Sequence, residues 1–209
     1  MRLTADVLVE LREKMDEVVV SYPPHIYRVE GPPIIGTAFF PGGCGLWCGL
    51  EYFAPPPRLF PESPVMFVAH NYSSANAFQL LRTKGGEAGS WWRDRVVPLL
   101  RVAGIDPARA FFTNALMGLK DGESTGSMNA TEQFESECSS FLLEQLRIVK
   151  PTAVVAFGGD AYPRVRRVFL SVLKCMHPSA REFNRLETRA ERIGAAASDL
   201  RAALDTRLP

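Results

Sequence analysis

The stretch Pro64-Val65-Met66-Phe67-Val68-Ala69-His70-Asn71-Tyr72-Ser73 is an apolar run that ends abruptly in polar side chains. Two later stretches have the same form: residues 109–112 lead into Thr113-Asn114, and residues 170–176 lead into His177-Pro178-Ser179. Continuous apolar strands are typical of parallel sheets that are covered on both faces. Ligands of such sheets bind outside the carboxyl ends of the strands. The sequence therefore predicts one crevice at these endings, which hold two of the chain's three histidines.

The rest of the chain alternates between strand and helix patterns. Apolar spacing predicts strands at 65–69, 110–113, 152–157 and 170–176, and helices at 4–20, 91–103, 131–148, 161–169 and 185–203. Thr4 is the expected N-cap of the first helix. We expect an α/β fold: a three-layer α/β/α sandwich with a central four-stranded parallel sheet.

The length of 209 residues fits a single domain. Within it we expect an N-terminal helix and a long Pro- and Gly-rich loop over residues 1–64. The α/β core would cover residues 65–180 and a C-terminal helix residues 181–209.

Composition limits the compartment and the partners. The chain has no apolar stretch of the ~18–20 residues that span a membrane, and its N-terminus is amphipathic and acidic rather than signal-like. We therefore expect a cytoplasmic monomer with reduced cysteines and no membrane partner. The net charge of +1 does not by itself indicate a nucleic-acid binder, although arginines crowd the last fifty positions.

Four motifs, in this order, resemble the uracil-DNA glycosylase superfamily over roughly residues 40–180. They are residues 66–73, Phe112-Thr113-Asn114, the block from Cys138 to Gly158, and His177-Pro178-Ser179. The resemblance implies the fold of that family and a hydrolase of base excision repair. Such an enzyme cleaves the N-glycosidic bond of uracil, or of a related damaged base, after the base has flipped out of single- or double-stranded DNA.

The resemblance also implies roles for individual residues. Asn71 would orient the attacking water, and His177 would donate a hydrogen bond to the O2 side of uracil. Asn114 would present a donor and an acceptor to the amide edge of uracil, which cytosine matches poorly. Taken singly, Asn71 and Asn114 could also be ordinary turn residues, and His177 a capping or core histidine.

Further contacts follow from the same comparison. Tyr72 and Trp92 are candidates for stacking on the flipped base, and Ser179 belongs to the motif of His177. His70 is either a supporting donor or a packing residue, because strand alternation turns it away from the crevice. The DNA-inserting loop of the family corresponds to the segment that holds Arg181, Phe183 and Arg185, and a helix-leading loop without that role is the alternative.

Two departures from the family pattern are visible. Family members commonly have Gly-x-Asn-Pro-Gly where this chain has Ala69-His70-Asn71-Tyr72-Ser73. Cys44, Cys48 and Cys138 resemble the iron–sulfur branch, but the cysteine after the Thr-Asn strand is replaced by Met117-Gly118-Leu119, and a metal site needs its full ligand set. We therefore predict no cofactor. The altered motif leaves two alternatives open: a non-catalytic nucleic-acid or damage-binding protein of the same fold, and a small-nucleoside hydrolase.

Overall fold

The structure of the protein is a computed structural model that describes residues 2–18, 21–28, 45–46, 58–76, 78–79, 92–122, 128–178 and 180–205. Among the helices in these ranges, none combines the length and the apolar character that crossing a bilayer requires.

A parallel sheet forms the centre of the molecule. Its four strands are β3 (Val65–Ser74), β4 (Ala110–Lys120), β5 (Ala153–Phe157) and β6 (Leu173–Cys175), in the order β4-β3-β5-β6. Two short strands, β1 (Ile26–Tyr27) and β2 (Gly45–Leu46), pair antiparallel with β4, so the described sheet has six strands. The predicted fold class and its four parallel strands are confirmed, and the two short antiparallel strands were not predicted.

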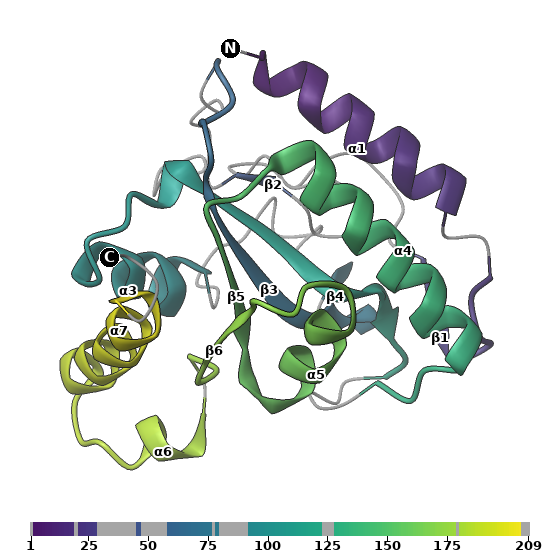
Figure 1. Cartoon of the computed structure of the whole chain (residues 1–209). Coiled ribbons are helices and arrows are strands. Elements are labelled where there is room, and N and C mark those ends of the chain that lie inside the picture. Colours follow the sequence, from purple (N-terminus) through teal and green to yellow (C-terminus); the bar gives the residue numbers. More distant parts are fainter. Residues whose placement is uncertain are drawn as a thin grey trace.

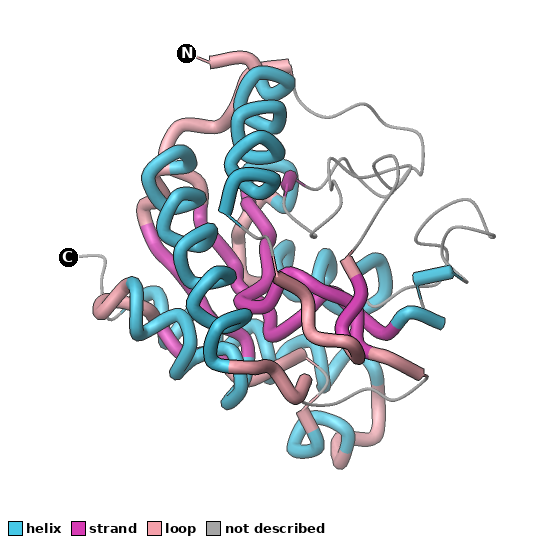
Figure 2. Tube along the Cα trace, turned by 90° about the vertical axis from the view of Figure 1, so that its right-hand side faces the viewer, coloured by secondary structure: helices cyan, strands magenta, loops and turns pink. Residues whose placement is uncertain are grey.

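Helices cover both faces of this sheet (Figure 1). One layer holds α1 (Thr4–Val18), α4 (Glu132–Val149) and α5 (Gly158–Val168), which pack on one face of the sheet. The other holds η1 (Trp92–Val96), α3 (Val97–Val102) and α7 (Arg189–Asp205). The short elements η2 (Pro107–Arg109) and α6 (Arg181–Asn184) precede β4 and α7. Figure 2 shows α1 and α4 side by side in front of the strands.

Two hydrophobic clusters fill the space between the layers. Met66 and Val68 of β3 belong to the cluster beneath α1, α4 and α5. Phe67 belongs to the cluster beneath α3 and α7. Its ring stacks between those of Phe112 on β4 and Phe157 on β5, with centroid distances of 5.5 and 5.3 Å. This alternation along β3 is what a strand buried on both faces requires.

The helices α1 and α4 begin in different ways. Thr131 caps α4, because its hydroxyl accepts the backbone N–H of Phe134 at 3.2 Å. The prediction of Thr4 as an N-cap is wrong: Thr4 is the first residue of α1, and its buried Oγ1 has no hydrogen-bond partner among the described residues. Its backbone N–H instead donates to the carbonyl of Arg58.

A close contact between β1 and β4 depends on a glycine. A Cβ atom on Gly118 would lie 2.5 Å from Cγ2 of Ile26, well inside van der Waals contact. Ile26 is 3% exposed and pairs through its backbone with Lys120. The side chain of Ile26 therefore occupies the space that a larger residue at position 118 would need.

Several element boundaries differ from the predicted ones. β3 and β4 do not end at Ala69 and Thr113 but continue side by side to Ser74 and Lys120, with a register irregularity between Asn71 and Ser73. β6 is shorter than expected, and Leu170 before it is 83% exposed. The predicted helix at 91–103 is a π-helical turn followed by α3, and the helix predicted at 185–203 begins later, as α7, with the short α6 before it.

Candidate functional site

His177 lies just beyond β6, on a segment whose backbone is fixed on both sides. The N–H of Met176 donates to Oδ2 of Asp199 on α7 at 2.7 Å. The carbonyl of His177 accepts the N–H of Ala180 at 2.7 Å, which closes a turn. These two bonds hold the histidine at the carboxyl end of the sheet, where the sequence predicted it.

The N-terminus of α5 packs directly against His177. Gly158, the first residue of α5, has a φ of +85°, which L side chains rarely adopt. A Cβ atom at Gly158 would lie 3.2 Å from Cβ of His177. The glycine thus allows both the sharp turn from β5 into the helix and the close approach of the imidazole.

His70 and Asn71 lie in the carboxyl half of β3, beyond the part of this strand that pairs with β5. His70 follows Met66 and Val68 in the alternation, so it lies on the sheet face that α5 covers. The side chains of His70 and Asn71 are hydrogen-bonded to each other. Nε2 of His70 is buried and has no hydrogen-bond partner among the described residues.

Electrostatic interactions connect the two histidines. Burial lowers the pKa of both His70 and His177, and a nearby arginine adds to the effect: Arg164 for His70 and Arg95 for His177. Asp160, on the first turn of α5, opposes this effect, because its negative charge raises the pKa of both histidines. Because the pKa of each imidazole lies below 6.5, both rings are neutral at neutral pH. Each can then donate one hydrogen bond without carrying charge.

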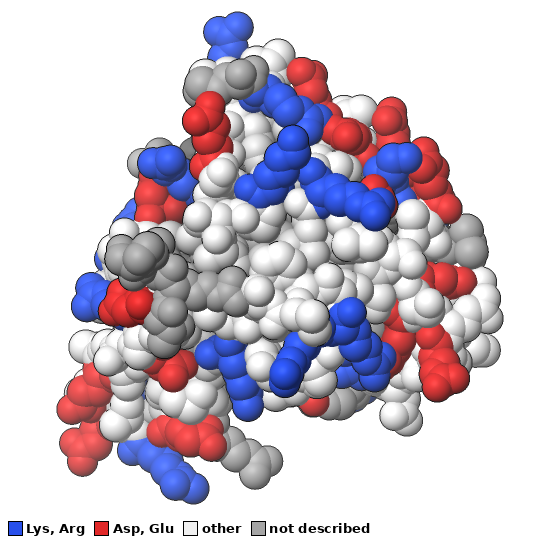
Figure 3. All heavy atoms as spheres, viewed as in Figure 1, with Lys and Arg blue, Asp and Glu red and all other residues white. Residues whose placement is uncertain are grey.

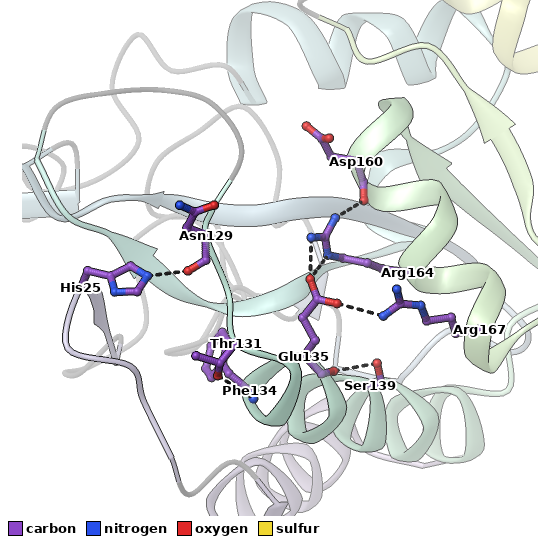
Figure 4. Close-up of polar contacts among 9 residues, drawn as sticks. All are labelled: His25, Asn129, Thr131, Phe134, Glu135, Ser139, Asp160, Arg164 and Arg167. Carbon is purple, nitrogen blue, oxygen red and sulfur yellow. Dashed lines mark hydrogen bonds and ion pairs between the residues drawn. The ribbon is translucent and has the colours of Figure 1, made fainter.

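An ion-pair cluster fixes α5 beside the site (Figure 4). Glu135 of α4 accepts two bonds from Arg164, at 2.6 and 3.1 Å, and one from Arg167 at 2.8 Å. Nη1 of Arg164 also donates to the carbonyl of Asp160 at 2.8 Å, while the carboxylate of Asp160 points away from Arg164. Burial opposes the ionisation of Glu135, but the two arginines outweigh it and lower its pKa. Figure 4 also shows the exposed His25 in contact with the carbonyl of Asn129.

Asn114 lies within β4 rather than at its end. It is 6% exposed, and its Cα pairs with that of Ala69. Asn71 is two residues beyond Ala69, so Asn71 and Asn114 face the same side of the sheet, with Cα atoms about 8 Å apart by strand geometry. The alternative that Asn114 is a turn residue is wrong, because β4 continues for six residues beyond it.

The structure separates the other predicted contacts into three groups. Phe183 is 4% exposed and packs in the cluster beneath α3 and α7, so the prediction that it contacts DNA is wrong. Arg185 is exposed directly after α6. Ser179 and the side chains of Tyr72, Trp92 and Arg181 lie outside the described part of the chain, and their predicted roles stay predictions.

Cys138 serves a packing role where it lies. Its Sγ accepts the backbone N–H of Met117 at 3.3 Å, and burial raises the pKa of its thiol to about 12. The described ranges contain no group of three or more His, Cys, Asp or Glu residues that could hold a metal ion. Cys44 and Cys48 lie outside the described residues.

Sequence reasoning missed several residues that shape the site. Gly158-Gly159-Asp160, directly after a buried strand, was a usable signal, since helix N-termini at strand ends commonly face ligands. Arg95 and Asp199 had no such signal. Only the folded chain brings η1 and α7 to the carboxyl end of β6.

The comparison with known families agrees with this geometry. A family described as "Uracil DNA glycosylase superfamily" matches residues 57–201, which include β3, β4, β5, β6 and every histidine of the site. The chain belongs to the uracil-DNA glycosylase superfamily, whose glycosidases act on DNA. No curated protein matches the chain.

Proposed function

We propose that this protein is a DNA glycosylase that hydrolyses the N-glycosidic bond of uracil, or of a related damaged base, flipped out of DNA. The observation that carries the proposal is the grouping of His70, Asn71 and His177 around the N-terminus of α5. This grouping stands beside the carboxyl ends of β5 and β6, the usual ligand edge of a parallel sheet, inside the segment that matches the family.

The proposed role of His177 follows from the charge that develops during cleavage. As the glycosidic bond breaks, the sugar becomes positive and the departing base becomes negative. A neutral imidazole fixed by Gly158 and the Met176–Asp199 bond can donate its N–H to a base oxygen without reorienting. A preorganised donor of this kind is typically worth about 3–4 kcal/mol in the transition state.

Asn71 would position the attacking water, and Asn114 would recognise the base. The carboxamide of Asn71, held by His70, would orient the attacking water but is too weak a base to deprotonate it. Asn114 carries a donor and an acceptor that match the O4 and N3–H edge of uracil. Cytosine reverses that pattern, so we propose that Asn114 discriminates against it.

The test measures abasic sites directly. Uracil-containing single strands and duplexes are incubated with the protein and then treated with alkali, which breaks the strand at abasic positions. We expect breakage by the wild type and a loss of about 10²–10³-fold in His177→Ala. Asn71→Ala should also lose activity, whereas Arg147→Ala, on the exposed side of α4, serves as the matched control. An unchanged rate in His177→Ala would refute the assignment.

One observation favours a second candidate, a protein of the same fold that binds DNA but does not release a base from it. β3 remains a paired strand through Asn71, whose Cα is in register with that of Leu116, and the motif lacks the flanking glycines of the family. A backbone held in the ladder has less freedom to approach a sugar. Tight, salt-sensitive binding to uracil-containing DNA without strand breakage would favour this candidate.

A further inference from the structure

Two cations share one aromatic ring at the junction of α5 and β6. Cζ of Arg166 lies 5.9 Å from the ring centroid of Tyr162, and Nζ of Lys174 lies 5.7 Å from it. Both distances lie within the range in which the ring face attracts a cation. The half-buried tyrosine therefore holds two exposed positive charges at one place on the surface.

The two cations differ from their neighbours in how they are paired. Arg164 and Arg167, on the same helix, are both neutralised by Glu135. Within the described ranges, neither Arg166 nor Lys174 has an acidic partner within ion-pair distance. Residues 158–177 contain four Lys or Arg residues but one acidic residue, in a chain whose net charge is only +1. Lys and Arg side chains gather over α5 and β6 in the lower centre of Figure 3.

This cluster adjoins the candidate active site. Lys174 precedes His177 by three residues, so their Cα atoms are at most about 11 Å apart. Tyr162 lies one helical turn along α5 from Gly158, which packs against His177. A DNA strand that delivers a base to His177 would therefore bring its flanking phosphates within reach of this cluster.

We propose that Tyr162, Arg166 and Lys174 form a binding site for the phosphodiester backbone of the DNA strand beside the flipped base. The inference rests on the proposed function, since it takes the crevice at His177 as the place of that base. The planar fork of Arg166 can bind two phosphate oxygens, and Lys174 adds a mobile point charge. The tyrosine ring keeps both side chains in place before DNA arrives, which reduces the entropy lost on binding.

The experiment measures DNA affinity as a function of salt. The dissociation constant of a fluorescent, uracil-free duplex is determined between 50 and 300 mM salt for the wild type and for the Arg166→Gln/Lys174→Gln double variant. Each lost phosphate contact reduces the slope of log K against log salt by about 0.9. We expect the slope to decrease by about 1.8 in the double variant.

The matched control removes two exposed arginines that lie outside the cluster, on the neighbouring helices α1 and α4. Arg12→Gln/Arg147→Gln changes the net charge equally, on α1 and α4, and should leave the slope near that of the wild type. Tyr162→Leu keeps an apolar side chain but removes the ring, so we expect weaker binding with the slope only partly reduced. A double variant with the slope of the wild type, or a control with an equal decrease, would overturn the proposal.

Base release separates this inference from the proposed function. If the protein releases uracil, the Arg166→Gln/Lys174→Gln variant should show a raised KM on duplex DNA and an unchanged kcat. If the protein releases no base, the proposed function fails, while the salt slopes still decide whether the cluster binds DNA.

Discussion

His177 is positioned by neighbours that are distant in sequence and by its own buried surroundings. Gly158 leaves room for its Cβ, Asp199 fixes the preceding peptide, and burial together with Arg95 keeps its ring neutral. His70 has the same electrostatic character, with Arg164 in place of Arg95. At the residue scale, the site consists of two uncharged imidazoles that the folded state protects from protonation.

The two histidines should make stability depend on pH. Their folded pKa values lie below 6.5, so the unfolded chain binds protons more readily in this range. The stabilisation they give is therefore complete above about pH 6.5 and is lost as the pH falls through their folded pKa values. We expect the urea midpoint of the wild type to decrease between pH 7.5 and 5.5. His70→Gln should show a smaller decrease, and an identical decrease in both proteins would contradict this account.

Gly158 and Gly159 form a natural pair for a substitution test. Gly158→Ala puts a side chain at a φ of +85° and 3.2 Å from Cβ of His177, so we expect a loss of about 1–3 kcal/mol in unfolding free energy. A Cβ at Gly159 meets nothing within 4 Å, and Gly159→Ala should be neutral or stabilise the helix by up to about 1 kcal/mol. Urea unfolding and abasic-site formation are measured for both variants. Equal behaviour of the two would show that Gly158 does not constrain the site.

At the scale of elements, the sequence predicts the layers better than the strand ends. The apolar runs before His70 and Asn114 correctly predicted two parallel strands, because burial on both faces requires continuous apolar sequence. Their polar continuations resembled loops. In the fold, β3 and β4 remain paired with each other beyond these residues. This pairing joins segments that are distant in the chain, so the sequence near each strand end does not predict it.

The same limit explains the errors in the candidate site. The place of His177 just beyond β6 could be predicted, because polar residues after apolar runs indicate strand ends, whereas Asn71 lies inside β3. Phe183 was read as a DNA contact, since nothing in its neighbourhood shows that α6 turns it into the core beneath α3 and α7. Its burial depends on packing against helices that lie far away in the chain.

The link between α4 and α5 should contribute measurably to stability. Glu135→Gln removes a carboxylate that accepts bonds from two arginines, and we expect a loss of about 2 kcal/mol in unfolding free energy. Glu144→Gln breaks only the exposed pair with Arg147, and should cost less than about 1 kcal/mol. Because its pKa is lowered, the Glu135 contribution should be present at neutral pH and disappear as the pH falls below about 4.5. Urea unfolding at pH 7 and pH 3.5 checks both expectations.

At the scale of the whole molecule, the C-terminal helix supports the site from outside the sheet. Asp199 of α7 holds the N–H of Met176, and Arg189 of α7 bonds to Asp94 on η1. Arg201 contacts the carbonyl of Val102 at the end of α3. The helix thus connects the segment of His177 to the layer that carries Arg95.

Because of this connection, we expect that a substitution of Asp199 on α7 lowers activity although the residue does not contact the substrate. Asp199→Ala should lower stability by about 2 kcal/mol and lower abasic-site formation by up to about 10²-fold, because misplacement of a catalytic group by 1 Å can cost that much. Asp199→Asn retains an acceptor oxygen and should restore most of the activity. Arg201→Ala removes another contact of α7 and should reduce thermal stability without a comparable loss of rate. An equal loss of rate in both Ala variants would show that Asp199 acts through stability alone.

The contact between Ile26 and Gly118 constrains the order in which this lineage can accept substitutions. Ile is branched at Cβ and stiff, so its Cγ2 cannot swing away from a new methyl group at position 118. A larger residue there becomes tolerable only after position 26 has changed to an unbranched or smaller one. The two sites are therefore coupled, and a relative with a side chain at position 118 is expected to have a smaller or unbranched residue at position 26.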